Sequence, residues 1–487
     1  MNLSMIRYIL GQVLAVEGLL MLPCSIVGFL YREEEAAMYV IVGACTLLLG
    51  LMLRMKKPAN TVIYLKEGCV STALCWIVMS IMGCLPFVLT GEIGSFTDAM
   101  FETVSGFTTT GASILTDVEA LSRVSLFWRS FTHWIGGMGV LVFVLAVVPL
   151  SGGSNINLMR AESPGPSVGK LVPKLRATAR ILYVIYMVMT VIEILLLLLG
   201  GMDLFDSLTL SFGTAGTGGF GIKNDSIGGY SVYCQWIIGV FMVLFGINFN
   251  AYYFILLKHF REAFSMEEVR TYLLVILGAV GIIFVNILDL CQNAFDALTK
   301  AFFQVASIIT TTGYGTTDFD LWPTTSKFIL VLLMFIGACA GSTGGGIKIS
   351  RFLIVGKTIG KEFGSYVHPK SIKKIQMDGK PIEHEVVRST NVYFMTYLAL
   401  FALFLFLISF EGLDLTSSFT AVAATFNNIG PGLGAVGPTC NFSLFSDFST
   451  WVLTFAMLAG RLELFPMLML FHPTLWKESF FSSRQKS

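Results

Sequence analysis

Charged residues are scarce in this chain: Asp, Glu, Lys and Arg make up 13% of its 487 residues, whereas hydrophobic residues make up 55%. A soluble core of this size does not need so much apolar side chain. The composition therefore excludes an ordinary soluble protein and predicts an all-α polytopic membrane protein. The net charge is only +1, and a chain with so little excess of basic residues is not expected to bind nucleic acid.

The sequence also lacks the common signatures of catalysis. It contains no HExxH, no G-x-S-x-G, no pair of intramembrane aspartates and no ATPase phosphorylation motif. Gly341–Lys348 has the wrong spacing for a Walker-type phosphate loop, and no strand precedes it. The nine cysteines form no CxxC pair and lie mostly in apolar stretches, which predicts buried thiols. We therefore expect neither an enzyme nor an organic cofactor, and we expect any transport to run on ion gradients.

Long apolar stretches fill most of the chain. A helix needs about 20 apolar residues to cross a bilayer. Ten stretches are expected to do so, near residues 4–30, 36–54, 68–90, 125–150, 178–200, 233–257, 270–290, 327–350, 389–410 and 449–472. The first has no A-x-A-like cleavage site after it, so we expect a first span and not a removed signal peptide.

Lys and Arg gather in the segments that join spans two and three, four and five, six and seven, and eight and nine. The segments on the opposite side hold few basic residues, and none lies between residues 411 and 449. The positive-inside rule therefore predicts that the basic segments and both termini are cytoplasmic.

Four shorter semi-apolar stretches lie between spans, at residues 95–107, 205–216, 296–309 and 416–427. Each covers about three helical turns, which is too short to cross a bilayer. Each begins near an acidic residue that is expected to cap it. These residues are Asp98, Asp206, Asp296 and Asp414.

Each short stretch leads into a segment rich in Gly, Thr or Asn. The segments are FTTTGAS (Phe107–Ser113), GTGGFG (Gly216–Gly221), ITTTGYG (Ile309–Gly315) and FNNIGPGLG (Phe426–Gly434). When the chain is cut at Ala99, Ser207, Ala301 and Ser418, a glycine stands twelve residues after each cut: Gly111, Gly219, Gly313 and Gly430. We interpret the four segments as loops that enter the membrane from the outer side and surround one pore.

Such loops suit a dehydrated cation. Non-helical backbone at membrane depth is tolerated only where protein buries it or water reaches it, and carbonyl oxygens can replace the hydration shell of potassium. Glycine lets carbonyls turn toward an axis, and Thr hydroxyls add oxygen ligands. The short helices end near the loops, where their partial negative charge favours a cation. The candidate ion-binding residues are Thr109, Thr110, Gly111, Gly218, Gly219, Thr311, Thr312, Gly313, Asn428, Ile429 and Gly430. The alternative is that these small residues serve close helix packing.

The eighth expected span contains the run FIGACAGSTGGGIK. Each glycine in a helix costs roughly 1 kcal/mol relative to alanine, so we predict a broken, flexible segment over Ala338–Gly346 below the loops. Its residues are Ala338, Cys339, Ala340, Gly341, Ser342, Thr343, Gly344, Gly345 and Gly346. The alternative is a tight helix crossing.

Arg461 is a charge in the last expected span, where it needs a polar environment. It is expected to repel cations below the loops, to anchor the broken segment through backbone carbonyls, or to pair with a carboxylate. Glu17 and Glu193 also lie in apolar spans and are able to carry protons, although a structural hydrogen-bonding group or a helix-end residue is favoured for each. His133 precedes Trp134 and is expected at the membrane interface.

Several of these motifs together resemble the Trk/Ktr/HKT superfamily of potassium transporters, specifically its TrkH-type membrane subunit. They are FETVSGFTTTGAS (101–113), HWIGGMGVLV (133–142), MRAESPGP (159–166), GSTGGGIKISR (341–351), FNNIGPGLG (426–434) and AGRLELFP (459–466). The resemblance implies four helix–pore-helix–helix repeats around one pore, at residues 67–165, 166–265, 266–385 and 386–487, after two extra helices at residues 1–66. By position it places the filter glycines at Gly111, Gly219, Gly313 and Gly430, with Gly218 as an alternative in the second loop.

The resemblance also makes Ala338–Gly346 an intramembrane gating loop. It implies a homodimer and a cytosolic ring of TrkA-type regulatory subunits that bind nucleotide, a domain not expected in this chain itself. We therefore expect potassium uptake across a bacterial inner membrane. A secondary transporter built from two inverted halves is the competing class, but here four repeats share one orientation. Channel-like movement and coupling to protons or sodium both stay open.

Overall fold

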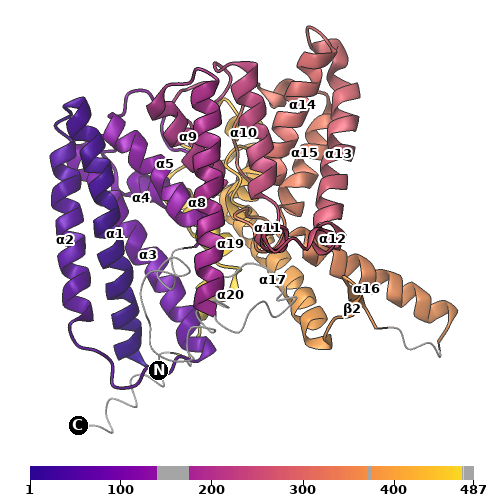
Figure 1. Cartoon of the computed structure of the whole chain (residues 1–487), viewed down its shortest axis with the longest axis horizontal. Coiled ribbons are helices and arrows are strands. Elements are labelled where there is room, and N and C mark those ends of the chain that lie inside the picture. Colours follow the sequence, from indigo (N-terminus) through magenta and orange to yellow (C-terminus); the bar gives the residue numbers. More distant parts are fainter. Residues whose placement is uncertain (140–174, 370–373, 474, 476–487) are drawn as a thin grey trace.

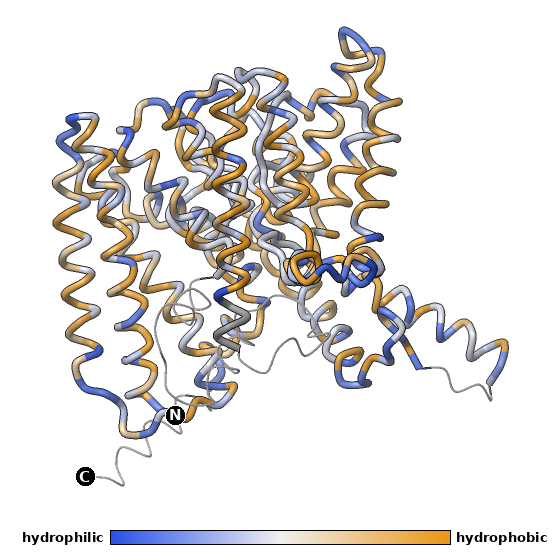
Figure 2. Tube along the Cα trace, in the orientation of Figure 1, coloured by the Kyte–Doolittle hydropathy of each residue, from blue (hydrophilic) through white to orange (hydrophobic). Residues whose placement is uncertain are grey.

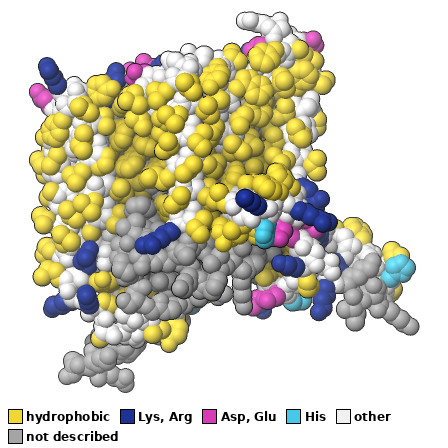
Figure 3. Space-filling model, in the orientation of Figure 1, with side chains coloured by type: hydrophobic (Ala, Val, Ile, Leu, Met, Phe, Trp, Pro, Cys, Tyr) yellow, Lys and Arg dark blue, Asp and Glu magenta, His cyan; other side chains and the backbone are white. Residues whose placement is uncertain are grey.

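The computed structural model describes residues 1–139, 175–369, 374–473 and 475, and these are predominantly helical (Figure 1). Most of the long helices run side by side between two faces of the molecule. Hydrophobic residues cover them along their length (Figure 2), and Figure 3 shows a broad hydrophobic belt between rims that carry the charged side chains. A bilayer requires this distribution. The predicted all-α polytopic membrane protein is confirmed.

Two antiparallel helices form the N-terminal edge, α1 (Leu3–Tyr31) and α2 (Ala36–Arg54). They pack so closely that a Cβ added to Gly18 would lie less than 3.0 Å from backbone atoms of Gly43 and Leu47. Here glycine does serve close helix packing, as it commonly does in membranes.

The rest of the described chain repeats one pattern: a long helix, a short helix, and a second helix that returns. The first set is α3 (Leu65–Thr90), α4 (Phe96–Phe107) and α5 (Arg123–Gly137), and the second is α8 (Leu175–Leu199), α9 (Leu204–Gly216) and α10 (Val232–Phe245). The third is α13 (Glu267–Ile287), α14 (Ala294–Ile309) and α15 (Thr324–Ile336), and the fourth is α17 (His384–Ile408), α18 (Leu415–Phe426) and α19 (Asp447–Arg461). The four short helices lie where they were predicted.

Three returning helices are interrupted, and only one interruption was predicted. In the third set, residues 337–348, here called the inner loop, separate α15 from α16 (Ile349–Val367). In the second set, α10 is followed by α11 (Phe249–Leu256) at an angle of 89°. In the fourth set, α20 (Phe465–Met469) follows α19 after a break in which Glu463 and Leu464 have positive φ. The expected spans at 233–257 and 449–472 are therefore interrupted, which the sequence did not predict.

By length and composition, six helices of the described residues can cross a membrane, and the bent α10–α11 pair would make a seventh. The expected span at 125–150 is described only as far as residue 139. Of the other elements, α12 (Phe260–Ser265) and the hairpin of β1 (Gln376–Met377) and β2 (Lys380–Pro381) lie on the same side of the molecule as α16 (Figure 1).

The helix caps correct one sequence prediction. Asp414 does cap α18, because its carboxylate accepts a hydrogen bond from the Ser417 N–H at 3.1 Å, and hydrogen bonds from Ser417 hold the Asp414 pKa below its usual range. The residues at the starts of the other three short helices are Ser95, Asp203 and Asn293. The predicted Asp98, Asp206 and Asp296 lie three residues later. Acidic residues in a first turn complement the helix dipole without capping it, which explains why the composition misplaced the caps.

All nine cysteines are described, and six of them are buried. Cys45 and Cys440 are exposed, so the prediction of buried thiols is wrong for these two.

Candidate functional site

The four short helices end in the same way. The N–H of Thr110 donates to the carbonyl of Ser105 at 2.9 Å, and Gly218, Thr312 and Ile429 make the equivalent bond five residues back at 2.8, 2.9 and 2.8 Å. A second bond, three residues back, joins the preceding residue to its helix in all four cases. This pair of bonds defines the Schellman helix ending. The sequence differences between the loops therefore do not alter the backbone.

A left-handed residue stands at each of these helix ends, and none of the four is glycine. The φ angles are 54° at Thr109, 56° at Thr217, 59° at Thr311 and 57° at Asn428. A β-branched residue rarely adopts this conformation, and such strain collects at functional sites. Sequence analysis did not single out Thr217, because the second loop lacks the TTG pattern of the first and third.

The glycine two residues further on is the position that the sequence spacing predicted. Its φ is +76° at Gly111, +78° at Gly219, +86° at Gly313 and +99° at Gly430. The backbone therefore aligns Gly219 with the other three glycines, and Gly218 takes the middle position that Thr110, Thr312 and Ile429 occupy.

These glycines close the four loops into one ring. A Cβ added to Gly111 would meet the carbonyl oxygen of Gly218, and a Cβ added to Gly219 would meet the carbonyl oxygen of Thr312. In the same way, a Cβ on Gly313 would meet the carbonyl oxygen of Ile429, and a Cβ on Gly430 would meet the carbonyl oxygen of Thr110. Each approach is below 3.0 Å, which real Cβ atoms essentially never show. Each loop thus presents its middle carbonyl to the glycine of the loop before it, in chain order. We call residues 109–111, 217–219, 311–313 and 428–430 the loop ring.

The segments that follow the loops also meet in cyclic order. Between the first and second segments, the Val118 N–H donates to the Asn224 side chain at 2.9 Å, and between the second and third, the Ile227 N–H donates to the Gly315 carbonyl at 2.9 Å. Between the third and fourth segments, the Gly434 N–H donates to the Asp320 carboxylate at 3.2 Å. Between the fourth and first, the Phe442 N–H donates to the Ser113 carbonyl at 2.8 Å. All four loops therefore open to one face, as the sequence predicted.

Hydroxyl groups brace the ring. The hydroxyls of Thr110 and Thr312 lie 2.8 Å from those of Thr108 and Thr310. Asn428 donates to the Thr110 hydroxyl at 2.9 Å, which joins the fourth loop to the first. The Thr109 hydroxyl is buried and has no hydrogen-bond partner among the described residues. Most of these side chains therefore hold the loops, and Thr109 keeps an oxygen available.

His133 explains why the second loop has a glycine in the middle position. Its Nδ1 lies 2.7 Å from the carbonyl of Gly106, and its Nε2 accepts from the Phe220 N–H at 3.2 Å. Its ring occupies the space that a Cβ on Gly218 would need. The expected interfacial place for His133 is wrong, because the imidazole side chain is fully buried next to the loop ring.

A buried ion pair behind the first two loops was missed by the sequence analysis. Arg129 on α5 contacts the Glu102 carboxylate of α4 at 2.6 Å, and both side chains are buried. Glu102 also accepts from the Ile114 N–H at 2.9 Å, and Arg129 donates to the Gly221 carbonyl at 3.2 Å. The sequence contained an indication of this pair, because Glu102 and Arg129 are ionisable residues in apolar helix segments, where a charge needs a partner. The pair therefore holds the segments that directly follow loops one and two.

The inner loop lies directly against the loop ring. Gly345 N–H donates to the Thr311 hydroxyl at 2.5 Å, and Gly346 N–H donates to the Asn427 carbonyl at 3.0 Å. A Cβ on Gly345 would approach the Asn427 carbonyl to 2.6 Å. The predicted broken segment, Ala338–Gly346, is therefore non-helical and touches loops three and four. The alternative of a continuous helix crossing is wrong.

Arg461 holds the inner loop through backbone carbonyls. It donates to the carbonyl of Thr343 at 3.0 Å, and to those of Gly136 and Gly137 at 2.6 and 2.8 Å. Of the roles predicted for Arg461, anchoring of the loop is the one that these contacts favour. The neighbouring Glu463 pairs with Arg351 of α16, a contact that the sequence analysis did not predict.

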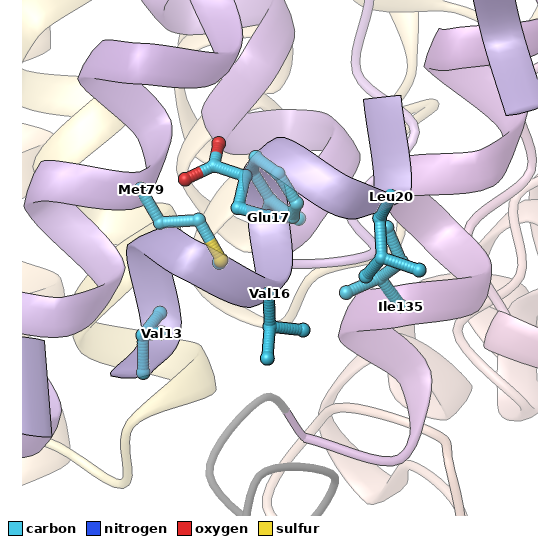
Figure 4. Close-up of a pocket in the computed structure, with 7 residues that line it drawn as sticks. Val13, Val16, Glu17, Leu20, Met79 and Ile135 are labelled. Atoms are coloured by element: carbon cyan, nitrogen blue, oxygen red, sulfur yellow. The ribbon is translucent and has the colours of Figure 1, made fainter. Parts of the chain in front are cut away.

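The two other acids from the apolar spans are both fully enclosed. Glu17 of α1 lines a cavity of about 10 Å³ among apolar side chains (Figure 4), room for one water molecule. Neither of its carboxyl oxygens has a hydrogen-bond partner among the described residues. The favoured structural hydrogen bond is therefore not seen for Glu17. Glu193 of α8 is buried near Thr214 of α9, and its carboxyl oxygens also have no hydrogen-bond partner among the described residues, so the favoured hydrogen bond is not seen there either.

Comparisons with known proteins agree with this architecture. Residues 37–483 match the family model described as TrkH, cation transport protein. The chain is 34% identical over 489 residues to the Trk system potassium uptake protein TrkH of Escherichia coli K12, covering 98% of this chain and 100% of that protein. It is 32% identical over 486 residues to TrkG of the same strain, with the same coverage.

The crystal structure of the potassium transporter TrkH from Vibrio parahaemolyticus matches with a TM-score of 0.88 and 32% identity, covering 98% of this chain and 100% of that one. These relatives are named as transport proteins and not as enzymes. The chain belongs to the TrkH family of cation transport proteins.

Proposed function

We propose that this protein takes up potassium ions through the loop ring. The observation that carries the proposal is the closure of the ring: four loops of different sequence share one backbone, and each places its middle carbonyl against the glycine of the preceding loop. Relatives of the whole chain are named as potassium uptake proteins, which identifies potassium as the cargo to test first.

The chemistry of the ring fits a monovalent cation. Its candidate ligands are neutral oxygens, namely backbone carbonyls and the hydroxyl of Thr109, and no residue of the ring is acidic. Four helices end at the ring, so their partial negative charges add to the attraction. Neutral carbonyl oxygens replace the hydration shell of potassium at less cost than that of a smaller ion. The residues proposed to bind the ion are those of the sequence prediction, with Gly219 as the equivalent glycine of loop two.

The inner loop is proposed as the gate of this pore. It lies against loops three and four, and Arg461 ties it to the Gly136 and Gly137 carbonyls on the opposite side of the ring. A segment placed across the ring in this way obstructs passage until it moves. Positive φ at Gly337, Gly341 and Gly346 makes a second backbone arrangement accessible.

Assembly and orientation are further parts of the proposal. The words "Trk system" in the relatives' names favour a multi-component system. We propose a homodimer in the inner membrane, with both termini and the basic segments in the cytoplasm and a TrkA-type, nucleotide-binding subunit beneath. The repeat boundaries predicted from the sequence, 67–165, 166–265, 266–385 and 386–487, are kept.

The alternative is that the same pore couples potassium to protons or sodium. The enclosed acids Glu17 and Glu193 are the side chains that favour it, because each lies beside a short helix that ends at the ring.

One experiment tests these readings together. The purified chain is placed in liposomes, and uptake of potassium, rubidium, sodium and lithium is compared. We expect potassium and rubidium to exceed the smaller ions, and equal uptake of all four would reject the ring as a filter. A potassium flux that changes with an imposed pH or sodium gradient at constant voltage supports coupling, and an unchanged flux supports a channel-like pore.

A further inference from the structure

The start of α13 contacts both the inner loop and the β1–β2 hairpin, and the hairpin has no role in the proposed pore. Its first two residues, Glu267 and Glu268, make contacts in different directions. Glu268 contacts the inner loop, whereas Glu267 contacts α16 and the β1–β2 hairpin. Neither residue belongs to the loop ring.

Glu268 is a buried anchor of the inner loop. Its side chain is almost fully enclosed, and one carboxylate oxygen accepts from the Ala340 N–H at 2.6 Å. The other oxygen accepts from the Asn248 side chain at 3.3 Å, at the break between α10 and α11. Phe249 N–H in turn donates to the Gly341 carbonyl at 3.0 Å. Glu268 therefore holds the breaks of the second and third helix sets together.

The neighbouring residue is tied to the hairpin. The backbone N–H of Glu267 donates to the Asp378 carboxylate at 2.7 Å, so a residue 111 positions away accepts a hydrogen bond from the first turn of α13. The Glu267 side chain forms an ion pair with Lys357 of α16, and Lys357 also donates to the Gln376 carbonyl at 2.6 Å.

The hairpin is a compact unit with its own tight turn. Asp378 and Gly379 both have positive φ, 51° and 73°, which is the conformation of a two-residue type I′ turn. Met377 is buried, whereas Asp378 is exposed. The hairpin thus offers an accessible surface that is fixed to the start of α13.

We propose that the hairpin and the start of α13 form a lever that sets the position of the inner loop, with Glu268 as the positioning residue. The proposal rests on the proposed role of the inner loop as the gate. Glu267 and Glu268 are adjacent in one helix, so a displacement of the hairpin displaces the Glu268 carboxylate from Ala340.

The test uses two readouts on the full-length chain. The first is potassium flux in liposomes without any partner. The second is the rate at which a maleimide modifies Cys339, which lies in the inner loop and is fully buried, measured by mass spectrometry of its peptide. Cys234, buried at the start of α10, serves as the internal reference.

Glu268→Gln keeps the shape of the side chain but removes its charge. Hydrogen bonds to charged groups are stronger than neutral ones by an amount that corresponds to roughly fivefold in an equilibrium. We expect both the flux and the Cys339 modification to rise by about that factor, with Cys234 unchanged. Asp378→Asn should raise both by less. Adding it to Glu268→Gln should give no further rise, because Asp378 acts through the same contact.

Glu262→Gln is the matched control, an exposed carboxylate on α12 with the same change of charge. If Glu268→Gln behaves like this control while Arg461→Ala raises the flux, the lever is wrong and the gate stands. If neither variant raises the flux, the gate itself is rejected. Independent, additive effects of Asp378→Asn and Glu268→Gln would also overturn the lever. Should Glu268→Gln not fold, Asp378→Asn at the exposed hairpin decides the question with the same two readouts.

Discussion

Replacing Gly313 with serine tests the loop ring at one of its tightest points. Gly313 has a φ of +86°, and a Cβ there would overlap the Ile429 carbonyl and lie 3.0 Å from the Pro431 ring. The left-handed conformation alone costs a residue with a Cβ about 1–2 kcal/mol. The overlap adds to this cost, because the obstacle is backbone and not the end of a flexible side chain.

The expected result is a loss of selectivity and not only of activity. The strain is relieved when the Ile429 carbonyl moves away, which changes the spacing of one of four oxygens. A strain of about 1.4 kcal/mol corresponds to a factor of ten, so we expect the ratio of potassium to sodium uptake to fall by about tenfold in Gly313→Ser. The measurement is the initial uptake of both ions into liposomes at matched protein content.

Two other glycines serve as controls for this variant. Gly278 is exposed on α13 and has open space around it, so Gly278→Ser should keep the parent ratio. At Gly430 the nearest atom, the Thr110 carbonyl oxygen, would be 2.9 Å from the added Cβ, against 2.0 Å for the Ile429 oxygen at Gly313, so the backbone has a smaller distance to shift. Gly430→Ser should therefore lose less selectivity than Gly313→Ser. An unchanged ratio in Gly313→Ser would refute the assignment of the ring as the filter.

Three further predictions concern the surroundings of the ring. Arg461→Ala, or deletion of Gly344–Gly346, should raise basal potassium flux, because each removes contacts of the inner loop; flux equal to the parent's would count against the gate. Glu102→Gln should lower thermal stability by about 3–5 kcal/mol, because Arg129 is left as an unpaired buried charge, and restoration by a second change of Arg129 to Met is the diagnostic observation in a melting assay. Glu17→Leu should raise the melting temperature, because a carboxyl without a described partner is replaced by apolar surface; a lower melting temperature would point to a partner for Glu17.

Local patterns explain which parts of the site were predictable. The places of Gly111, Gly219, Gly313 and Gly430 just after the ends of their helices are set by bonds that reach back three and five residues. Such bonds depend on neighbouring residues alone, so aligned segments carried the information. The poor helix propensity of the glycines at 344–346 made the interruption of the third set predictable in the same way.

The errors lie where distant residues decide. No residue near position 133 in the sequence indicates that the His133 ring fills the space beside Gly218. The pair His133–Trp134 alone therefore favoured a place at the membrane interface. The breaks after α10 and α19 were missed because neither contains a run of glycines like that at residues 344–346. Their partners, Glu268 and Arg351, lie on other helices.

By itself, the sequence determined the membrane class, the four short helices, the glycine of each loop and the break below them. These follow from composition and from contacts within a few residues, which a linear pattern records. Only the tertiary structure decided the closure of the ring, the choice of Gly219 over Gly218 in loop two, and the anchoring of the inner loop by Arg461. Asn428 and Thr110 are separated by 318 positions, and Arg461 and Thr343 by 118. Such contacts depend on how helices pack, because a buried polar group needs a partner but its own sequence does not say where that partner lies.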